Sequence, residues 1–202
     1  MSLDVGRAPR LAVSQRVDVI AGRNERRDAL DQQLTAWLVE VGCLPLPVPN
    51  TLAGAVEGWL RAIAPSAALL SGGNDVGDVP ERDRIEQALL DYARDRHLPV
   101  LGICRGMQMM GVWSGVTLAA VEGHVGTRHV LSGKLAGEVN SFHNFALAAC
   151  PGNFDVLAQS ADGAIEAIGH QTLPWQGWMW HPEREAVRAK ADLNRARALF
   201  RG

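Results

Sequence analysis

The 202-residue sequence has little that would crosslink a protein or anchor it to a membrane. Its three cysteines, Cys43, Cys104 and Cys150, are an odd number without a CxxC pair, so neither a disulfide framework nor a zinc site is indicated. No apolar run reaches the roughly 18 residues of a membrane span, and no N-terminal stretch resembles a signal peptide. We therefore predict a cytoplasmic protein that does not interact with a membrane.

The sequence also lacks a strong net charge. The sequence contains 20 Lys and Arg residues and 22 Asp and Glu residues, which gives a formal net charge of -2 at pH 7. Because nucleic acids are bound largely through an excess of basic residues, this balance does not favour a nucleic-acid partner. No stretch is rich enough in Ser, Gly, Pro or charged residues to indicate a linker, and the sequence contains no internal repeat. We expect a single domain over residues 10–202.

Apolar segments predict an α/β fold. Strand-like and helix-like segments alternate up to residue 113, which favours a mostly parallel central sheet flanked by helices. Short strand-like segments then follow, and these predict extra antiparallel strands in the C-terminal half. The expected strands are 11–17, 43–48, 67–71, 98–103, 116–121, 137–147, 154–160, 164–170 and 175–180; helices are expected near 30–42, 53–63, 85–92, 105–113 and 183–200.

Cys104 is the strongest candidate for chemistry. A buried-strand segment leads into Gly102-Ile103-Cys104-Arg105-Gly106, the pattern of a strand-to-helix turn that exposes a nucleophile. The helix that follows would favour the thiolate form at its N-terminus. Cys43 and Cys150 lack this glycine frame and fit inert structural positions.

A cysteine nucleophile requires a base, and the base requires an acceptor that orients it. His181 lies in Trp180-His181-Pro182-Glu183, so Glu183 could hold the imidazole toward the thiol. His143 is the alternative base, but it has no acidic residue shortly after it, and a role in substrate binding suits it better.

The remaining histidines do not suggest a metal site. His124, His129 and His170 lie in turn-like or strand-like stretches without the spacing of metal ligands. Structural or substrate-contacting roles are favoured for them. We predict no metal and no other cofactor.

Acyl transfer also requires donors for a developing oxyanion. Ser71-Gly72-Gly73-Asn74-Asp75 follows a buried strand, at the sheet edge where α/β proteins place their sites. The N–H of Arg105, the residue after the nucleophile, would be the second donor. A plain Gly-Gly turn with a helix cap explains the same string equally well.

Four ordered motifs resemble those of the class I glutamine amidotransferases of the Cys-His-Glu type. They are Gly102–Gln108, Ser71–Asp75, Ser141–His143 and Trp180–Glu183. Arg105 after the cysteine resembles the γ-glutamyl hydrolase branch, which includes γ-glutamyl-γ-aminobutyrate hydrolase. The resemblance covers nearly the whole chain and implies a flavodoxin-like α/β fold.

The resemblance also implies roles for individual residues. Cys104 would attack a γ-glutamyl carbonyl, His181 would transfer protons, and Glu183 would orient His181. Gly73 and Arg105 would supply the oxyanion N–H groups. The glutamyl α-amino and carboxylate groups would be held by Gln108 and by the backbone of Ser141, Phe142 and His143.

The expected partner is a small γ-glutamyl substrate. The stretch from Gly73 to Arg82 is shorter than in the larger γ-glutamyl hydrolases, which resembles a small branch that cleaves a γ-glutamyl cytidine-diphosphoramidate. Since no synthetase is fused to the domain, a stand-alone hydrolase is our leading hypothesis. A glutaminase subunit serving a separate synthetase and a non-catalytic binding protein are the alternatives; a homodimer is possible.

Overall fold

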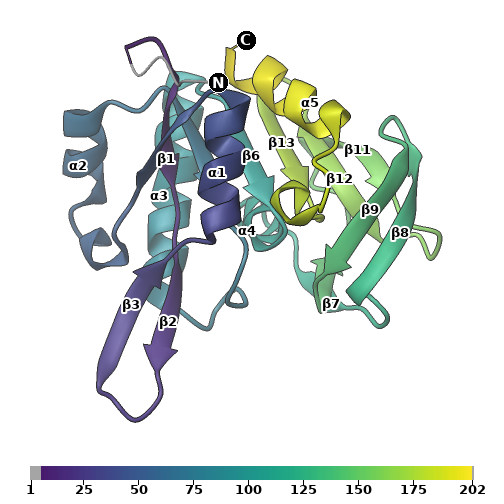
Figure 1. Ribbon diagram of the computed structural model, residues 1–202, viewed down its shortest axis with the longest axis horizontal. Coiled ribbons are helices and arrows are strands. Elements are labelled where there is room, and N and C mark those ends of the chain that lie inside the picture. The colour runs from purple at the N-terminus through teal and green to yellow at the C-terminus, as the bar shows by residue number, and fades with distance from the viewer. Residues whose placement is uncertain (1–5, 202) are drawn as a thin grey trace.

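A nine-stranded sheet forms the centre of the computed structural model, which describes residues 6–201 (Figure 1). Residue 202, the last of the predicted domain, lies outside the described residues. The strand order across the sheet is β4 (Leu44–Pro47), β1 (Arg10–Val13), β5 (Ala67–Leu70), β6 (Val100–Ile103), β13 (Trp175–Trp178), β12 (Ile165–His170), β11 (Phe154–Gln159), β8 (Val125–Gly133) and β9 (Gly137–Phe142).

The sheet changes direction at β13. The strands from β4 to β13 pair in parallel, whereas those from β13 to β9 pair antiparallel. The central strands β5 and β6 are buried at every residue, as expected for parallel strands covered on both faces. The predicted fold, a mostly parallel sheet with extra antiparallel strands, is confirmed.

Helices cover both faces of the parallel part. α1 (Gln32–Val41) and α5 (Lys190–Arg201) share one apolar cluster with Leu69 of β5. α2 (Val56–Ile63), α3 (Pro80–Arg96) and α4 (Arg105–Trp113) share the other with Leu70. Because successive strand residues point to opposite faces, each strand contributes to both clusters. The carboxyl ends of β5 and β6 thereby become rigid supports for the loops that follow them.

The prediction of one strand over residues 11–17 is wrong. β1 ends at Val13, and β2 (Arg16–Ile20) pairs with β3 (Glu25–Ala29) in a hairpin that projects from the body (Figure 1). The charged and mostly exposed sequence of β3 has no apolar alternation, so it gave no strand signal. The hairpin docks through Asn74, whose side chain accepts from Val17 N (2.8 Å) and donates to Val17 O (3.0 Å).

The C-terminal half also differs from the prediction. The expected strand over residues 137–147 is two strands, β9 and β10 (Phe145–Leu147), and β10 pairs with β7 (Leu118–Ala120). Strand β8 was missed.

The final helix is shorter than predicted, because α5 begins at Lys190 rather than at residue 183. A 3₁₀ turn, η2 (Pro182–Arg184), is followed by Glu185 in extended conformation. The Glu185 carboxylate accepts hydrogen bonds from Arg128 (3.2 Å) and Asn140 (2.9 Å). A second 3₁₀ turn, η1 (Asn50–Leu52), precedes α2, so the helix predicted from residue 53 begins at Val56.

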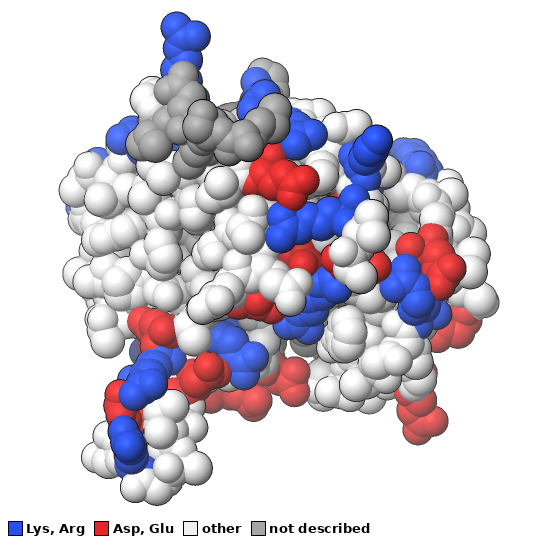
Figure 2. Space-filling view, viewed as in Figure 1, with Lys and Arg blue, Asp and Glu red and all other residues white. Residues whose placement is uncertain are grey.

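Acidic and basic side chains are interspersed on the face shown in Figure 2, including on the β2–β3 hairpin. This distribution matches the near-neutral net charge of the sequence. Within residues 6–201, none of the helices combines the length and the apolar character needed to span a bilayer.

Candidate active site

Cys104 sits in a strained turn between β6 and α4. Its backbone has φ 52° and ψ -107°, which is unusual for a residue other than glycine. A Cβ on Gly106 would lie 2.1 Å from the Leu70 carbonyl oxygen, and one on Gly102 would lie 2.7 Å from Met107 N. Only glycine fits at these two positions, so the predicted glycine-framed turn from strand to helix is present, and the role of Cys104 as nucleophile stays a prediction.

The turn places Cys104 beside His181, since both residues line one cavity and Cys104 is among the groups that raise the pKa of His181. His181 Nδ1 lies 2.6 Å from Glu183 Oε1. Since a carboxylate can only accept, Nδ1 carries the hydrogen and Nε2 is left for the thiol. All three side chains are buried. The structure thus brings together the three residues that the sequence selected as nucleophile, base and orienting acid.

The backbone of His181 is held by Asn140 on the neighbouring strand β9. The Asn140 side chain accepts from His181 N (2.9 Å) and donates to His181 O (2.8 Å). These two hydrogen bonds hold the His181 backbone in place and so help to position its imidazole. Sequence analysis missed Asn140, because nothing in its local sequence links it to a residue 41 positions away.

The environment of His181 favours its charged form. Burial opposes a positive charge there, but the hydrogen bonds with Cys104 and Glu183 outweigh it and raise the pKa of His181 to about 9. The N-terminus of α4 favours negative charge at Cys104. The site is therefore suited to holding a charged imidazolium beside the Cys104 sulfur at neutral pH.

The loop after β5 packs directly against His181. A Cβ on Gly72 would lie 2.6 Å from His181 Cε1, and Gly73 has φ +84°. The buried Arg82 side chain donates to the carbonyls of Ser71 (2.6 Å), Gly72 (3.1 Å) and Gly73. The loop that carries Gly73, the predicted oxyanion donor, is thus held in place by hydrogen bonds from the single guanidinium group of Arg82.

Arg105 borders the site, but its guanidinium group is engaged in a buried network of ion pairs with α3. Its guanidinium group donates to Glu86 and Asp83 of α3, and Glu86 also accepts from Arg82 (3.0 Å). The side chain therefore points away from Cys104. Only the backbone N–H of Arg105 is left for the predicted oxyanion role, which stays a prediction.

A cavity of about 180 Å³ gathers most of the predicted site residues. Its lining includes Gly73, Cys104, Arg105, Gln108, Phe142, His143 and His181. Ser141 is fully buried, and its hydroxyl donates to the His124 carbonyl (2.7 Å). Gln108 Nε2 donates to the Phe145 carbonyl (2.8 Å). The predicted substrate contacts of Gln108 and of the Ser141–His143 backbone stay predictions.

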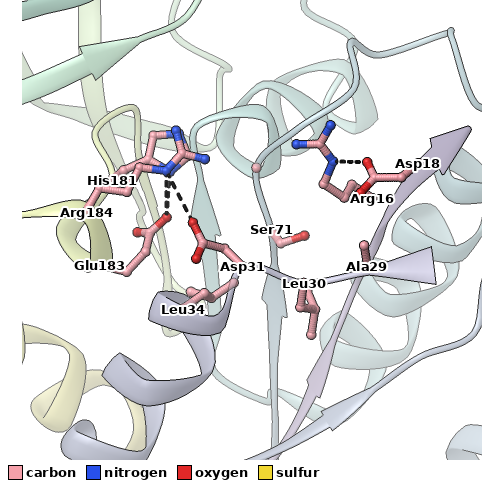
Figure 3. Close-up of a pocket in the computed structure, with 11 residues that line it drawn as sticks. Arg16, Asp18, Ala29, Leu30, Asp31, Leu34, Ser71, His181, Glu183 and Arg184 are labelled. Carbon is pink, nitrogen blue, oxygen red and sulfur yellow. Dashed lines mark hydrogen bonds and ion pairs between the residues drawn. The ribbon is translucent and has the colours of Figure 1, made fainter. Parts of the chain in front are cut away.

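Two arginines that sequence analysis did not select also face this cavity. Arg16 of β2 and Arg184 of η2 line it, and both line an adjoining cavity of about 230 Å³ beside His181 and Glu183. Figure 3 shows Arg16 on one side and Arg184, with His181, on the other. Arg16 pairs with Asp18 (2.7 Å) and Arg184 with Asp31 (3.7 Å). The position of Arg184 directly after Glu183 was the one available signal.

Comparison with known families places this site in context. Residues 27–197 match the family described as Glutamine amidotransferase class-I. The chain belongs to this family. It is 35% identical over 125 residues to a γ-glutamyl-CDP-amidate hydrolase of Campylobacter jejuni, covering 59% of this chain and 62% of that protein. Over 129 residues it is 36% identical to a glutamine-hydrolyzing GMP synthase subunit of Methanothrix thermoacetophila, covering 59% of this chain and 71% of that protein.

Solved structures of low sequence identity share the fold. A putative GMP synthase subunit from Thermoplasma acidophilum superposes with a TM-score of 0.74 at 19% identity, covering 96% of this chain and 95% of that one. A glutamine amidotransferase from Thermotoga maritima gives a TM-score of 0.63 at 15% identity, covering 88% and 77%. The family match over residues 27–197 confirms the resemblance inferred from four motifs at the level of the family.

Proposed function

We propose that this amidotransferase-family chain is a cysteine-dependent hydrolase of γ-glutamyl amides. The observation that carries the proposal is the buried group of Cys104, His181 and Glu183: Cys104 lies at the strained turn after β6 and shares a cavity with His181, and His181 Nδ1 is 2.6 Å from Glu183 Oε1. A buried thiol held toward a raised-pKa imidazole, beside a cavity, is the arrangement that nucleophilic acyl transfer requires.

In the proposed reaction the Cys104 thiolate attacks the γ-carbonyl carbon, forming a C–S bond. The oxyanion lies against the N–H groups of Gly73 and Arg105. The C–N bond then breaks, and the leaving nitrogen takes a proton from the His181 imidazolium. A water molecule next gives a proton to His181 and attacks the thioester, which releases glutamate and restores the thiolate.

The glutamyl group would be recognised on the far side of the same cavity. We assign its α-amino and carboxylate groups to Gln108 and to the backbone of Ser141, Phe142 and His143. The cavity lining supports this assignment, because Gln108, Phe142 and His143 all border it together with Cys104. Phe142 also lies edge-on to His181, with ring centroids 6.0 Å apart, and closes that side of the base.

The two arginines favour a leaving group that carries phosphate. Ammonia offers nothing for Arg16 or Arg184 to bind, whereas guanidinium groups bind phosphate oxygens in paired geometry. The relative from C. jejuni is named for γ-glutamyl-CDP-amidate. We therefore propose γ-glutamyl-CDP-amidate as the substrate, with glutamate and cytidine diphosphoramidate as products.

A panel of γ-glutamyl amides tests the reaction itself. Wild-type protein should release glutamate, and Cys104→Ala should lower the rate by about 10⁴-fold or more, because the nucleophile is removed. Cys150→Ala is the matched control, since Cys150 lies outside both cavities. Equal activity of wild type and Cys104→Ala would refute the mechanism.

A second comparison tests the leaving group. Arg16→Ala should lower kcat/KM for γ-glutamyl-CDP-amidate by roughly 10-fold or more and for γ-glutamyl-aminobutyrate by less, because a diphosphate offers a guanidinium group more anionic oxygens than a single carboxylate does. Arg27→Ala on the same hairpin is the control, since Arg27 pairs with Glu25 outside the cavities. Cleavage of the aminobutyrate compound alone would exclude the proposed substrate.

A glutaminase that serves a separate synthetase is the second candidate. The match to the GMP synthase subunit of M. thermoacetophila supports it. In that case free glutamine would be hydrolysed only with a synthetase partner present, and a synthetase would co-purify with the chain. Rapid cleavage of γ-glutamyl-CDP-amidate by the isolated chain favours the first candidate instead.

A further inference from the structure

Three histidines and one glutamate meet inside the antiparallel part of the molecule. His124 precedes β8, His129 lies on β8, His143 follows β9, and Glu166 lies on β12. One nitrogen or oxygen atom from each of the four lies within 4.8 Å of the others. The sequence separations are too long for a local metal-binding motif, so sequence analysis could not connect them.

Glu166 makes this cluster unusual. Its side chain is 0% exposed, and neither carboxylate oxygen accepts a hydrogen bond from any described residue. A buried carboxylate without donors is strongly unfavourable unless a positive charge lies beside it. Among residues 6–201, no Lys or Arg forms an ion pair with Glu166; the groups beside it are imidazole nitrogens at 3.5 Å.

Two of the histidines present a nitrogen lone pair to that carboxylate. His124 Nε2 lies 2.9 Å from Asp162 Oδ2, and His143 Nδ1 lies 3.0 Å from the Phe145 carbonyl. Both partners can only accept, so each of these nitrogens carries the hydrogen. The opposite nitrogens, His124 Nδ1 and His143 Nε2, are then unprotonated in the neutral rings. Outer acceptors of this kind orient histidines that bind metals.

The spacing of the inward atoms fits a tetrahedral ion. His124 Nδ1 and His143 Nε2 are 3.3 Å apart, and each is 3.5 Å from Glu166 Oε1. A Zn²⁺ ion with bonds of about 2.0–2.1 Å places tetrahedral ligands roughly 3.3–3.4 Å apart. His129 can complete the set, because its Nε2 is buried and has no hydrogen-bond partner among the described residues.

We propose that His124, His129, His143 and Glu166 form a binding site for one divalent transition metal, with Zn²⁺ the best match. Imidazole-rich sites with one carboxylate suit zinc. Four protein ligands make a closed site, so its role is structural: it fastens β8 and β9 to β12 at the end of the molecule opposite the β2–β3 hairpin (Figure 1). His143 also lines the cavity of Cys104, so the metal would stiffen one wall of that cavity.

Metal content measured in a Cys104→Ala background tests this proposal independently of activity. That background removes the thiol, which could itself bind zinc. After loading with ZnCl₂ and desalting, we expect about one Zn²⁺ per chain by elemental analysis. Glu166→Gln and His129→Asn should each reduce the retained zinc at least about 10-fold. Co²⁺ loading should give the intense visible absorption of tetrahedral cobalt, which both variants lose.

His97→Asn is the matched control. His97 is exposed at the end of α3 in the left-handed conformation, which Asn tolerates, and it lies outside the cluster. Far-UV circular dichroism establishes that each variant is folded; if Glu166→Gln is not, the partly exposed His129→Asn decides. The proposal is overturned if the Cys104→Ala protein retains no zinc, or if a folded variant retains as much zinc as that protein does. The four side chains would then be held by hydrogen bonds among themselves and not by a metal ion.

Discussion

At the scale of single residues, the charge state of His181 governs the site. Its pKa of about 9 lies above the ordinary 6.5, so the imidazolium form persists through neutral pH and is lost as pH rises through about 9. We expect kcat/KM for a γ-glutamyl amide to fall on the alkaline side near that pH. The same shift should stabilise the fold fully below 6.5, with the benefit lost between 6.5 and about 9.

Cys104 and Glu183 both raise the pKa of His181, and Glu183→Gln tests the contribution of Glu183. The amide keeps the shape of the side chain but removes the negative charge that supports the imidazolium. The alkaline limb of the kcat/KM profile should therefore move to lower pH, with a reduced maximal rate. Glu185→Gln is the control, because Glu185 contacts Asn140 and Arg128 and not the imidazole. An unmoved limb in Glu183→Gln would contradict the role given to this carboxylate.

Gly72 offers a second residue-scale prediction. A methyl group at this position would lie 2.6 Å from His181 Cε1 and would push the ring from the thiol. We expect Gly72→Ala to lower kcat on the order of 100-fold, as misplacements of about 1 Å do elsewhere. Gly54→Ala is the control, because its added methyl meets nothing within 4 Å. Similar kcat values for the two variants would argue against tight packing behind the base.

At the scale of elements, α3 supports the loops of the candidate site through a buried network of ion pairs that includes Arg82 and Glu86. Arg82 and Glu86 are four residues apart on α3, and both side chains are 0% exposed. Arg82→Met removes one of the two positive charges that pair with the buried Glu86 carboxylate. We expect the substitution to lower the free energy of unfolding by about 3–5 kcal/mol. Arg61→Met removes a pair of the same spacing that is 64% and 80% exposed, and should cost at most about 1 kcal/mol. Urea unfolding of both variants measures the difference, and equal losses would contradict the assignment.

Which elements could be predicted depended on their burial. The strands β5 and β6 and the turn at Cys104 have local signals, namely continuous apolar residues and a glycine frame. Strand β3 of the hairpin has none, because four of its five side chains are charged, and the place of the hairpin is set by Asn74 from another loop. The three residues of the proposed triad could be selected from the sequence because each lies within a recognisable local motif. Arg16 could not be, since only the docked hairpin brings it to the cavity.

At the scale of the whole molecule, the cluster around Glu166 could not be predicted from the sequence, because its residues are far apart along the chain. His124, His129, His143 and Glu166 are separated along the sequence of the antiparallel extension. The pairing of β9 with β8, of β8 with β11 and of β11 with β12 brings them together. No local pattern marks such a site. Buried polar atoms without partners reveal it only once side chains are placed.

The continuity of the sheet predicts cooperative unfolding of the two halves. β13 joins them, because it pairs in parallel with β6 and antiparallel with β12. The sequence has six tryptophans, and all lie outside residues 114–174; fluorescence therefore reports on the parallel half, whereas circular dichroism reports on both.

Leu101→Ala tests this cooperativity. The substitution removes buried side-chain volume from β6 and should cost about 2–5 kcal/mol. If the sheet unfolds as one unit, the fluorescence and circular dichroism transitions in urea should stay superimposed and move together to lower urea concentration. The exposed Val19→Ala on the β2–β3 hairpin is the control and should leave both midpoints nearly unchanged. A dichroism transition that lags behind the fluorescence in Leu101→Ala would mean that the antiparallel extension is held by its own interactions, of which a metal bound at the Glu166 cluster would be the first to examine.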